Sequence, residues 1–129
     1  MRALGNARET AVGDTFDDAG YCVIALRASG SRGTHLRSRK HPVCGDLVAI
    51  PFDREANLPW FQIECGGVSK RASAALAELR TGLLPGFTPL VVLFRSRRRR
   101  YYLEGSTRGH ATLAEILDQL HPIPERKNP

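Results

Sequence analysis

The sequence has few cysteines, and they are widely spaced. Its three cysteines are Cys22, Cys44 and Cys65, and none forms a CxxC pair with another. An odd, scattered set argues against a disulfide framework. Cys22 and Cys65 fall in segments with the composition of β-strands, where cysteine usually acts as a small buried hydrophobic residue. We therefore expect reduced thiols and an intracellular protein.

The sequence also lacks a long apolar run. No segment approaches the roughly 20 apolar residues of a membrane-spanning helix, and residues 1–5 lack the apolar core of a signal peptide. Internal repeats, low-complexity blocks and linkers are absent too. With 129 residues, of which 42% are hydrophobic, the chain is expected to fold as one soluble, cytoplasmic domain over 1–129, with a frayed tail at about 122–129.

Acidic residues are outnumbered: 13 Asp and Glu face 19 Lys and Arg, giving a formal net charge of +6. Nucleic acid is the commonest partner of a small basic domain, although a soluble protein with a basic surface is the plainer alternative. Residues 95–100 are too charged for a core strand, so a hairpin tip is expected there. The residues expected to bind phosphates, rather than form solvated turns, are Arg32, His35, Arg37, Arg39, Lys40, Arg71, Arg97, Arg98, Arg99 and Arg100.

The apolar periodicity predicts three helices and five strands. The helices are expected at 6–19, 68–84 and 112–120, and the strands at 21–27, 45–50, 60–65, 89–94 and 101–103. Asn6 with Glu9, and Thr112 with Glu115, have the spacing of capping boxes. Three successive strands, then a helix and a further strand, predict an antiparallel meander plus a crossover strand. The fold class is therefore α/β, with a mixed central β-sheet flanked by helices.

Two carboxylates stand out because each belongs to an apolar strand segment. Asp46 opens Gly45–Ile50, and Glu64 lies near the end of Trp60–Cys65. A hairpin between these segments brings the two charges together, and a divalent metal ion is the usual reason to tolerate that. Hard oxygen ligands favour Mg²⁺, with Mn²⁺ able to substitute. The plainer reading is an aspartate that starts a strand and a glutamate on a solvent face.

Two further residues fit a metal site of this kind. Glu9 shares a helix face with Val12 and Phe16, so it is a candidate third metal ligand, or only a member of a capping box. Lys70 follows the second strand and is a candidate for orienting the attacking water or stabilising a pentavalent phosphate, or only a lysine on a helix surface.

These segments together resemble the PD-(D/E)XK nuclease superfamily. The resemblance rests on Glu9 in a leading helix, the strand into Gly30-Ser31, the run Gly45–Ile50 and the run Phe61–Glu64. Their order and lengths are most similar to the archaeal-type Holliday junction resolvases. The resemblance implies a restriction-endonuclease-like fold and a homodimeric, Mg²⁺-dependent endonuclease that acts on branched DNA such as a four-way junction.

The resemblance also assigns site residues. It implies that Glu9 is the helical glutamate, Asp46 the motif aspartate, Glu64 the motif glutamate, and Ser31 a serine near the scissile phosphate. The motif lysine is expected two residues after the glutamate, where this sequence has Gly66. Lys70 is the nearest candidate for a lysine that has moved.

Other functions remain open at this stage. A zinc site would need His35, His41, Cys44 and Cys65, but no second paired ligand motif accompanies them. If Lys70 cannot reach the carboxylates, the chain is a DNA-binding protein with a degenerate nuclease fold. A third hypothesis is an endonuclease that nicks ordinary duplex DNA.

Overall fold

A computed structural model of the protein describes residues 3–26, 42–96, 98–106 and 108–120. Eight elements follow one another in the order α1 (Ala3–Asp18), β1 (Tyr21–Ala25), β2 (Leu47–Pro51), β3 (Trp60–Gly66), α2 (Ala72–Thr81), β4 (Phe87–Arg95), β5 (Arg98–Leu103) and α3 (Leu113–Leu120). The number, type and order of the elements match those expected from the sequence. The segment expected to be a basic loop, at 28–41, lies outside the described residues.

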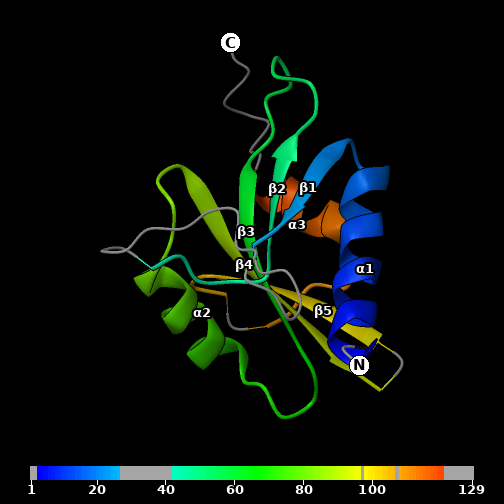
Figure 1. Cartoon of the computed structure of the whole chain (residues 1–129), viewed down its shortest axis with the longest axis vertical. Helices are drawn as coiled ribbons and strands as arrows, with labels where there is room; N and C mark the ends of the chain where they lie inside the picture. The colour runs from blue at the N-terminus through cyan, green and yellow to red at the C-terminus, as the bar shows by residue number, and fades with distance from the viewer. Residues whose placement is uncertain (1–2, 27–41, 97, 107, 121–129) are drawn as a thin grey trace.

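The five strands form one mixed sheet in the order β1-β2-β3-β4-β5. The pairs β1–β2, β2–β3 and β4–β5 are antiparallel, whereas β3 and β4 are parallel. The helix α2 makes the crossover that a parallel pair requires. Figure 1 shows α2 on one face of the sheet and α1 and α3 on the other. The predicted meander plus crossover strand is therefore confirmed.

The sheet is buried on both faces. The larger core lies under α1 and α3, and its aromatic centre is Phe16, Tyr21 and Phe61, with ring centroids 5.2 to 5.9 Å apart. The smaller core lies under α2 and includes Leu79 and Leu93. Because side chains alternate along a strand, the central strands are apolar almost throughout. A polar side chain between these cores therefore needs a specific partner.

The helix α1 begins earlier than expected. It starts at Ala3, so Asn6 lies inside the helix and the proposed Asn6–Glu9 capping box is wrong. Ala3 and Leu4 are good helix formers, and the helix includes them despite the intervening Gly5. The predicted buried face of the helix is confirmed, because Val12 and Phe16 are fully buried. Gly20, with φ +93°, follows the helix end in a conformation that favours glycine.

The helix α2 begins four residues later than expected, and α3 begins one residue later, after its predicted cap Thr112. The helix α2 begins at Ala72 rather than residue 68. The residues before it form a turn, in which the Lys70 N–H donates to the Gly67 carbonyl at 3.1 Å. At α3, the Glu115 N–H donates to Thr112 Oγ1 at 3.2 Å, as a capping box requires. The Glu115 carboxylate accepts from the Ala111 N–H instead of that of Thr112.

The arginine-rich segment contains the predicted hairpin tip, but the tip is shorter than expected because both strands extend into the segment. Arg95 ends β4, Arg98 begins β5, and the two residues pair across the hairpin. Between them lies Ser96, with φ +55°, as in a tight turn. The physical reason is that β5 is an edge strand, from which long charged side chains can reach water.

The cysteines are free thiols, as expected. Cys44 and Cys65 are half-buried, but Cys22 is exposed, so its predicted burial is wrong: Cys22 faces outward from an edge strand. Within the described part of the chain, no helix is long and apolar enough to cross a membrane.

Candidate carboxylate site

Asp46 is held by both of its neighbouring strands, one residue before β2 begins. Its N–H donates to the Ile63 carbonyl of β3 at 2.7 Å, and its carbonyl accepts from the Leu26 N–H, just after β1, at 2.9 Å. Its side chain is fixed as well, because Oδ2 accepts the Cys65 N–H at 2.9 Å. The carboxylate therefore lies against the stretch of β3 that contains Glu64.

Glu64 and Asp46 lie close together, as the predicted hairpin required. Leu47 pairs with Ile63 across β2 and β3, so the residues next to that pair are Asp46 and Glu64. Burial raises the pKa of Glu64; the hydrogen bond from Lys70 opposes this rise, and the negative charge of Asp46 adds to it. The carboxylates of Asp46 and Glu64 are thus close enough for each negative charge to disfavour the other.

Lys70 reaches back to Glu64. Its Nζ donates to Glu64 Oε2 at 2.8 Å, and the two side chains are 35% and 21% exposed. The hydrogen bond to Glu64 raises the pKa of Lys70, which keeps the ammonium charged. Lys70 precedes α2 and is not a helix-surface lysine. The structure therefore brings together Asp46, Glu64 and Lys70, the three residues on which the sequence-based site depended.

Glu9 and its neighbour Arg8 approach the site from α1, on the other face of the sheet. Their charges act on the thiol of Cys65. Burial raises the pKa of this thiol most, and the negative charges of Asp46, Glu9 and Glu64 raise it further. The positive charge of Arg8 lowers it. A Cβ on Gly67 would lie 2.7 Å from Arg8 Nη2. The sequence did not identify Arg8 as a site residue. The one sequence signal was the Gly66-Gly67 pair, because glycines leave room for the side chains of other residues.

Gly45 and Gln62 determine how the chain enters the site. Gly45 has φ +110°, a value that proline cannot adopt and other residues rarely do, so glycine is required immediately before Asp46. Gln62 is fully buried, and its Nε2 donates to the carbonyls of Cys44 and Gly82 at 2.6 and 2.8 Å. Its Oε1 accepts the Leu84 N–H at 2.9 Å. Gln62 thus ties the segment before Asp46 to the end of α2.

The two central carboxylates fit a hard divalent cation. The hydrogen bonds described above use one oxygen of each carboxylate. Of the residues that the structure describes, Lys70 is the cation that lowers the pKa of Glu64. Among the described residues, no three His, Cys, Asp or Glu side chains are grouped so as to hold a metal ion. Glu9 therefore forms no such group with Asp46 and Glu64. Two of the four residues of the zinc alternative, His35 and His41, lie outside the described residues. Two carboxylates, with water and phosphate oxygens, are a common ligand set for Mg²⁺.

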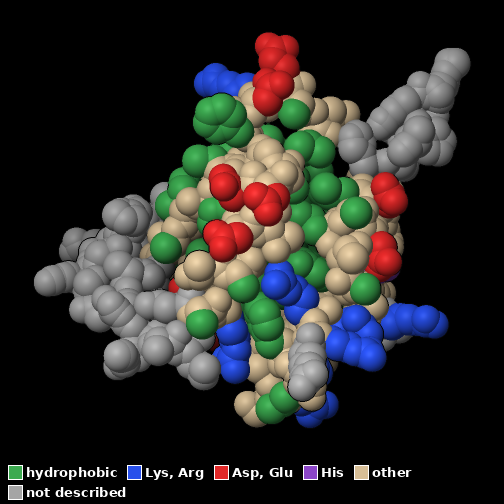
Figure 2. All heavy atoms as spheres, turned by 90° about the vertical axis from the view of Figure 1, so that its right-hand side faces the viewer, with side chains coloured by type: hydrophobic (Ala, Val, Ile, Leu, Met, Phe, Trp, Pro, Cys, Tyr) green, Lys and Arg blue, Asp and Glu red, His purple; other side chains and the backbone are tan. Residues whose placement is uncertain are grey.

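Basic side chains lie at the same end of the sheet. Arg98 and Arg71 are exposed, and Arg100 is half-exposed. Figure 2 views the α1 side of the molecule, where Lys and Arg side chains gather toward the lower end and Asp and Glu side chains lie above them. The predicted phosphate-binding residues Arg32, His35, Arg37, Arg39, Lys40 and Arg97, and the predicted site residue Ser31, lie outside the described residues.

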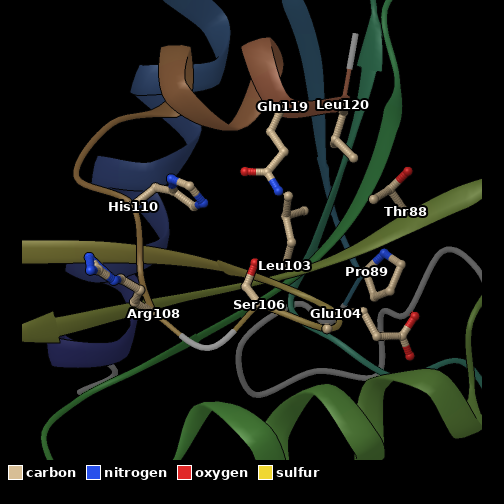
Figure 3. A pocket seen from close by; sticks show the side chains of 10 residues that line it. Thr88, Pro89, Leu103, Glu104, Ser106, Arg108, His110, Gln119 and Leu120 are labelled. Carbon is tan, nitrogen blue, oxygen red and sulfur yellow. The ribbon is translucent and has the colours of Figure 1, made fainter. Parts of the chain in front are cut away.

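A hollow lies at the end of β4 and β5 that is opposite to the carboxylate pair. Figure 3 shows the side chains of Ser106, His110 and Gln119 around it. The acidic residue that lines it, Glu104, forms an exposed ion pair with Arg80 of α2. This hollow therefore lacks the paired carboxylates of the first site, and the Asp46–Glu64 pair is the better candidate for chemistry.

Comparison with known proteins identifies the fold. No family model matches the chain, and no curated protein matches it. Among solved structures, the chain is similar to Hjc of Archaeoglobus fulgidus, a Holliday junction resolvase from an archaeal hyperthermophile. The TM-score is 0.53 and the identity 18%, and the match covers 89% of this chain and 96% of that one. The two chains share a fold. The fold expected from the short sequence motifs is thereby confirmed.

Proposed function

We propose that the protein is a metal-dependent DNA endonuclease, with branched DNA such as a four-way junction as its preferred substrate. One observation carries the proposal: the ion pair between Lys70 and Glu64 lies beside Asp46, whose negative charge acts on Glu64 and raises its pKa. Two carboxylates and a lysine at the end of a strand pair are a suitable set for phosphodiester hydrolysis. The fold shared with a Holliday junction resolvase supports the same reading.

Each residue has a distinct role in this proposal. Asp46 and Glu64 would hold Mg²⁺, and Mn²⁺ would substitute for it. Such an ion, when bound, supplies positive charge that offsets the charge growing on the phosphate. Lys70 keeps its ammonium within 2.8 Å of Glu64, where it can orient a water or stabilise the pentavalent phosphate. Glu9 is proposed to assist through a bridging water, and Ser31 to lie near the scissile phosphate.

Arg8 adds a second cation beside the site. Its guanidinium lies against Gly67, one residue beyond the end of β3. A guanidinium offers paired N–H donors that match phosphate oxygens. We assign Arg8 to binding the phosphate that is cut. The more distant basic residues Arg71, Arg98 and Arg100 would bind the flanking backbone, together with Arg32, His35, Arg37, Arg39, Lys40 and Arg97.

Symmetric cutting of a four-way junction needs two active sites. One chain carries one carboxylate pair, so the proposed activity requires a twofold homodimer. Analytical ultracentrifugation of the free protein and of its junction complex tests this part. Two protein chains for each junction is the expected stoichiometry, and one chain for each junction contradicts the resolvase subtype.

One assay tests the function. The protein is incubated with a labelled four-way junction, linear duplex or single strand, in Mg²⁺, Mn²⁺ or chelator. Paired symmetric nicks confined to the junction, and lost in chelator, are the expected result. Cutting of every duplex would instead indicate a general nicking endonuclease. Binding without metal-dependent cutting would leave a DNA-binding protein with a degenerate nuclease fold and overturn the proposal.

A matched pair of variants assigns any activity to the site. Glu64→Ala is expected to abolish cutting while DNA affinity stays nearly intact, because Glu64 contributes no positive charge. Glu104→Ala is the control, since Glu104 lies at the far end of the sheet and pairs with Arg80. Cutting by the Glu64→Ala protein would show that a contaminating nuclease, or another site, is responsible.

A further inference from the structure

Arg95 bonds to the turn that carries Lys70. It is the last residue of β4, the strand parallel to β3. Its Nη1 donates to the Val68 carbonyl at 3.2 Å, and its Nη2 donates to the Lys70 carbonyl at 3.4 Å. One planar guanidinium thus holds two carbonyls of one turn, and the second belongs to the lysine itself.

The turn has little other support on that side. The residue that follows Lys70, Arg71, occupies the N-cap position of α2 and makes no side-chain capping hydrogen bond. Val68 is 68% exposed, so it contributes little packing. Within the turn, the Lys70 N–H donates to the Gly67 carbonyl. Arg95 therefore ties the backbone of this short segment to β4, in addition to the ion pair between the Lys70 side chain and Glu64 of β3.

Lys70 depends on the turn because it does not belong to the strand. A lysine at position 66 would be oriented by the β3 ladder, on the same face as Glu64, because side chains two residues apart share a face. Lys70 instead approaches from four residues further along and lies over Gly66, close enough that a Cβ there would be 2.4 Å from its Cδ. Its path to Glu64 is set by the backbone of residues 67–70.

We infer that Arg95 is a positioning residue for Lys70: it fixes the turn, so that the lysine runs over Gly66 to Glu64. The inference rests on the proposed function for its catalytic consequence, but not for its structural part. It also separates Arg95 from the arginines proposed to bind DNA, because both of its described partners are backbone carbonyls. Lysine cannot replace it, since a single ammonium lacks the planar fork that reaches two carbonyls.

The decisive experiment moves the lysine onto the strand. In the double variant Gly66→Lys/Lys70→Gly, removal of the Lys70 side chain makes room for a side chain at residue 66. The new lysine at position 66 is then oriented by β3. Arg95→Met is made in the native protein and in this double variant. Single-turnover cleavage of the junction, with protein in excess, and junction affinity are measured separately.

The two backgrounds should respond differently. In the native protein, Arg95→Met should slow cleavage by about 100-fold, the order of loss from misplacing a catalytic group by about 1 Å, while junction affinity changes by less than about twofold. In the background with the lysine at position 66, the same change should slow cleavage by less than about twofold. An equal loss in both backgrounds, or a loss confined to affinity, would overturn the inference.

A second measurement needs no activity. The ε-methylene protons of a lysine held in one conformation are inequivalent in NMR spectra, and they become equivalent when the side chain rotates freely. The Lys70 signals, assigned by their loss in Lys70→Gly, should become equivalent in Arg95→Met. They should stay inequivalent in Arg98→Met, which removes the arginine paired with Arg95 across the hairpin.

The two readouts keep the claims apart. If the native protein never cuts DNA, the proposed function fails, but the NMR comparison still decides whether Arg95 orders Lys70. If Lys70 stays ordered in Arg95→Met, the positioning role is refuted even in an active nuclease.

Discussion

The side chain of Lys70 fills the space above Gly66. A Cβ on that glycine would lie 2.4 Å from Lys70 Cδ and 2.8 Å from Cε, closer than such atoms can approach. Gly66 stands where the nuclease motif resembled by the sequence has its lysine, so the absence of a side chain at position 66 gives room for the lysine from position 70. Lys70 Nζ lies 2.8 Å from Glu64 Oε2, so under the proposed function the lysine at position 70 would do the work of the lysine missing at position 66.

Gly66→Ala should therefore displace Lys70 and slow cutting. The new methyl group takes the space of the lysine chain, and we expect the single-turnover rate to fall by about tenfold or more. The fold should persist, because Gly66 has no positive φ and ends a strand. Gly13→Ala in α1 is the control, since a Cβ there makes only an ordinary 3.7 Å contact with Val23. A Gly66→Ala protein with an unchanged rate would show that the lysine needs no such space.

Divalent metal should stabilise the folded protein through Asp46 and Glu64. A ligand that binds only the folded state, at about 100 times its Kd, contributes about 2.7 kcal/mol. We expect Mg²⁺ and Mn²⁺ to raise the melting temperature of the native protein, and chelator to reverse the rise.

The carboxylate variants locate the metal effect. Asp46→Asn and Glu64→Ala should melt at the same temperature with and without metal, because each leaves one of the two carboxylates. Asp14→Asn, on the exposed surface of α1, should keep the metal response. A metal response that survives in both site variants would move the metal to another part of the protein.

Substitution of two adjacent arginines of β5 should change two different properties: DNA binding for Arg98 and stability for Arg99. Arg98 is exposed, whereas Arg99 donates to Thr15 Oγ1 of α1 at 2.9 Å and lies over the ring of Phe94, 5.2 Å from its centroid. Arg98→Ser should leave the free energy of unfolding unchanged and reduce the slope of log affinity against log salt by about one. Arg99→Ser should lower the free energy of unfolding by about 1 to 2 kcal/mol. Urea unfolding and DNA titrations over a range of salt concentrations measure both effects.

Equal effects of the two changes on the salt slope would contradict this division. That result would make Arg99 a phosphate contact as well as a support for α1. The sequence predicts one basic tip at residues 95–100, and the structure gives a physical reason to divide it. Alternation along β4 and β5 directs Arg95 toward the Lys70 turn and Arg99 toward α1, while Arg98 remains exposed.

The sequence predicted the parts of the fold and site that depend on short-range patterns. The Asp46–Glu64 approach follows from one hairpin, and hairpins are readable from two apolar segments and a turn. The crossover at α2 follows from the order of elements. The contact between Lys70 and Glu64 needed only the short reach from the end of β3.

The remaining features depend on contacts between distant segments. The helix α2 begins later than its periodicity suggested because residues 68–70 are held as a turn by Arg95, 25 residues further along the chain from Lys70. Arg8 near Gly67 depends on how α1 packs over the sheet. No local pattern encodes such pairs, so propensity and spacing could not place them.

Ionisation of Tyr21 should lower the free energy of unfolding at high pH. It is 2% exposed, its hydroxyl donates to the Pro59 carbonyl at 2.8 Å, and burial raises its pKa from 10.0 to about 12. Because the folded-state pKa is the higher one, the folded protein holds the proton more tightly than the unfolded chain. The resulting stability is fully present below pH 10 and is lost as pH rises from 10 toward 12.

The comparison with Tyr21→Phe isolates this contribution. Phenylalanine keeps the ring packed against Phe16 and Phe61 but loses the hydrogen bond, so Tyr21→Phe should be less stable by about 1 kcal/mol near neutral pH. Its free energy of unfolding should then fall less steeply above pH 10. Burial also raises the pKa of Cys65, but that thiol is present in both proteins and cancels in the difference. Parallel curves for the two proteins in alkaline urea titrations would mean that Tyr21 ionises as easily in the folded state as in the unfolded chain.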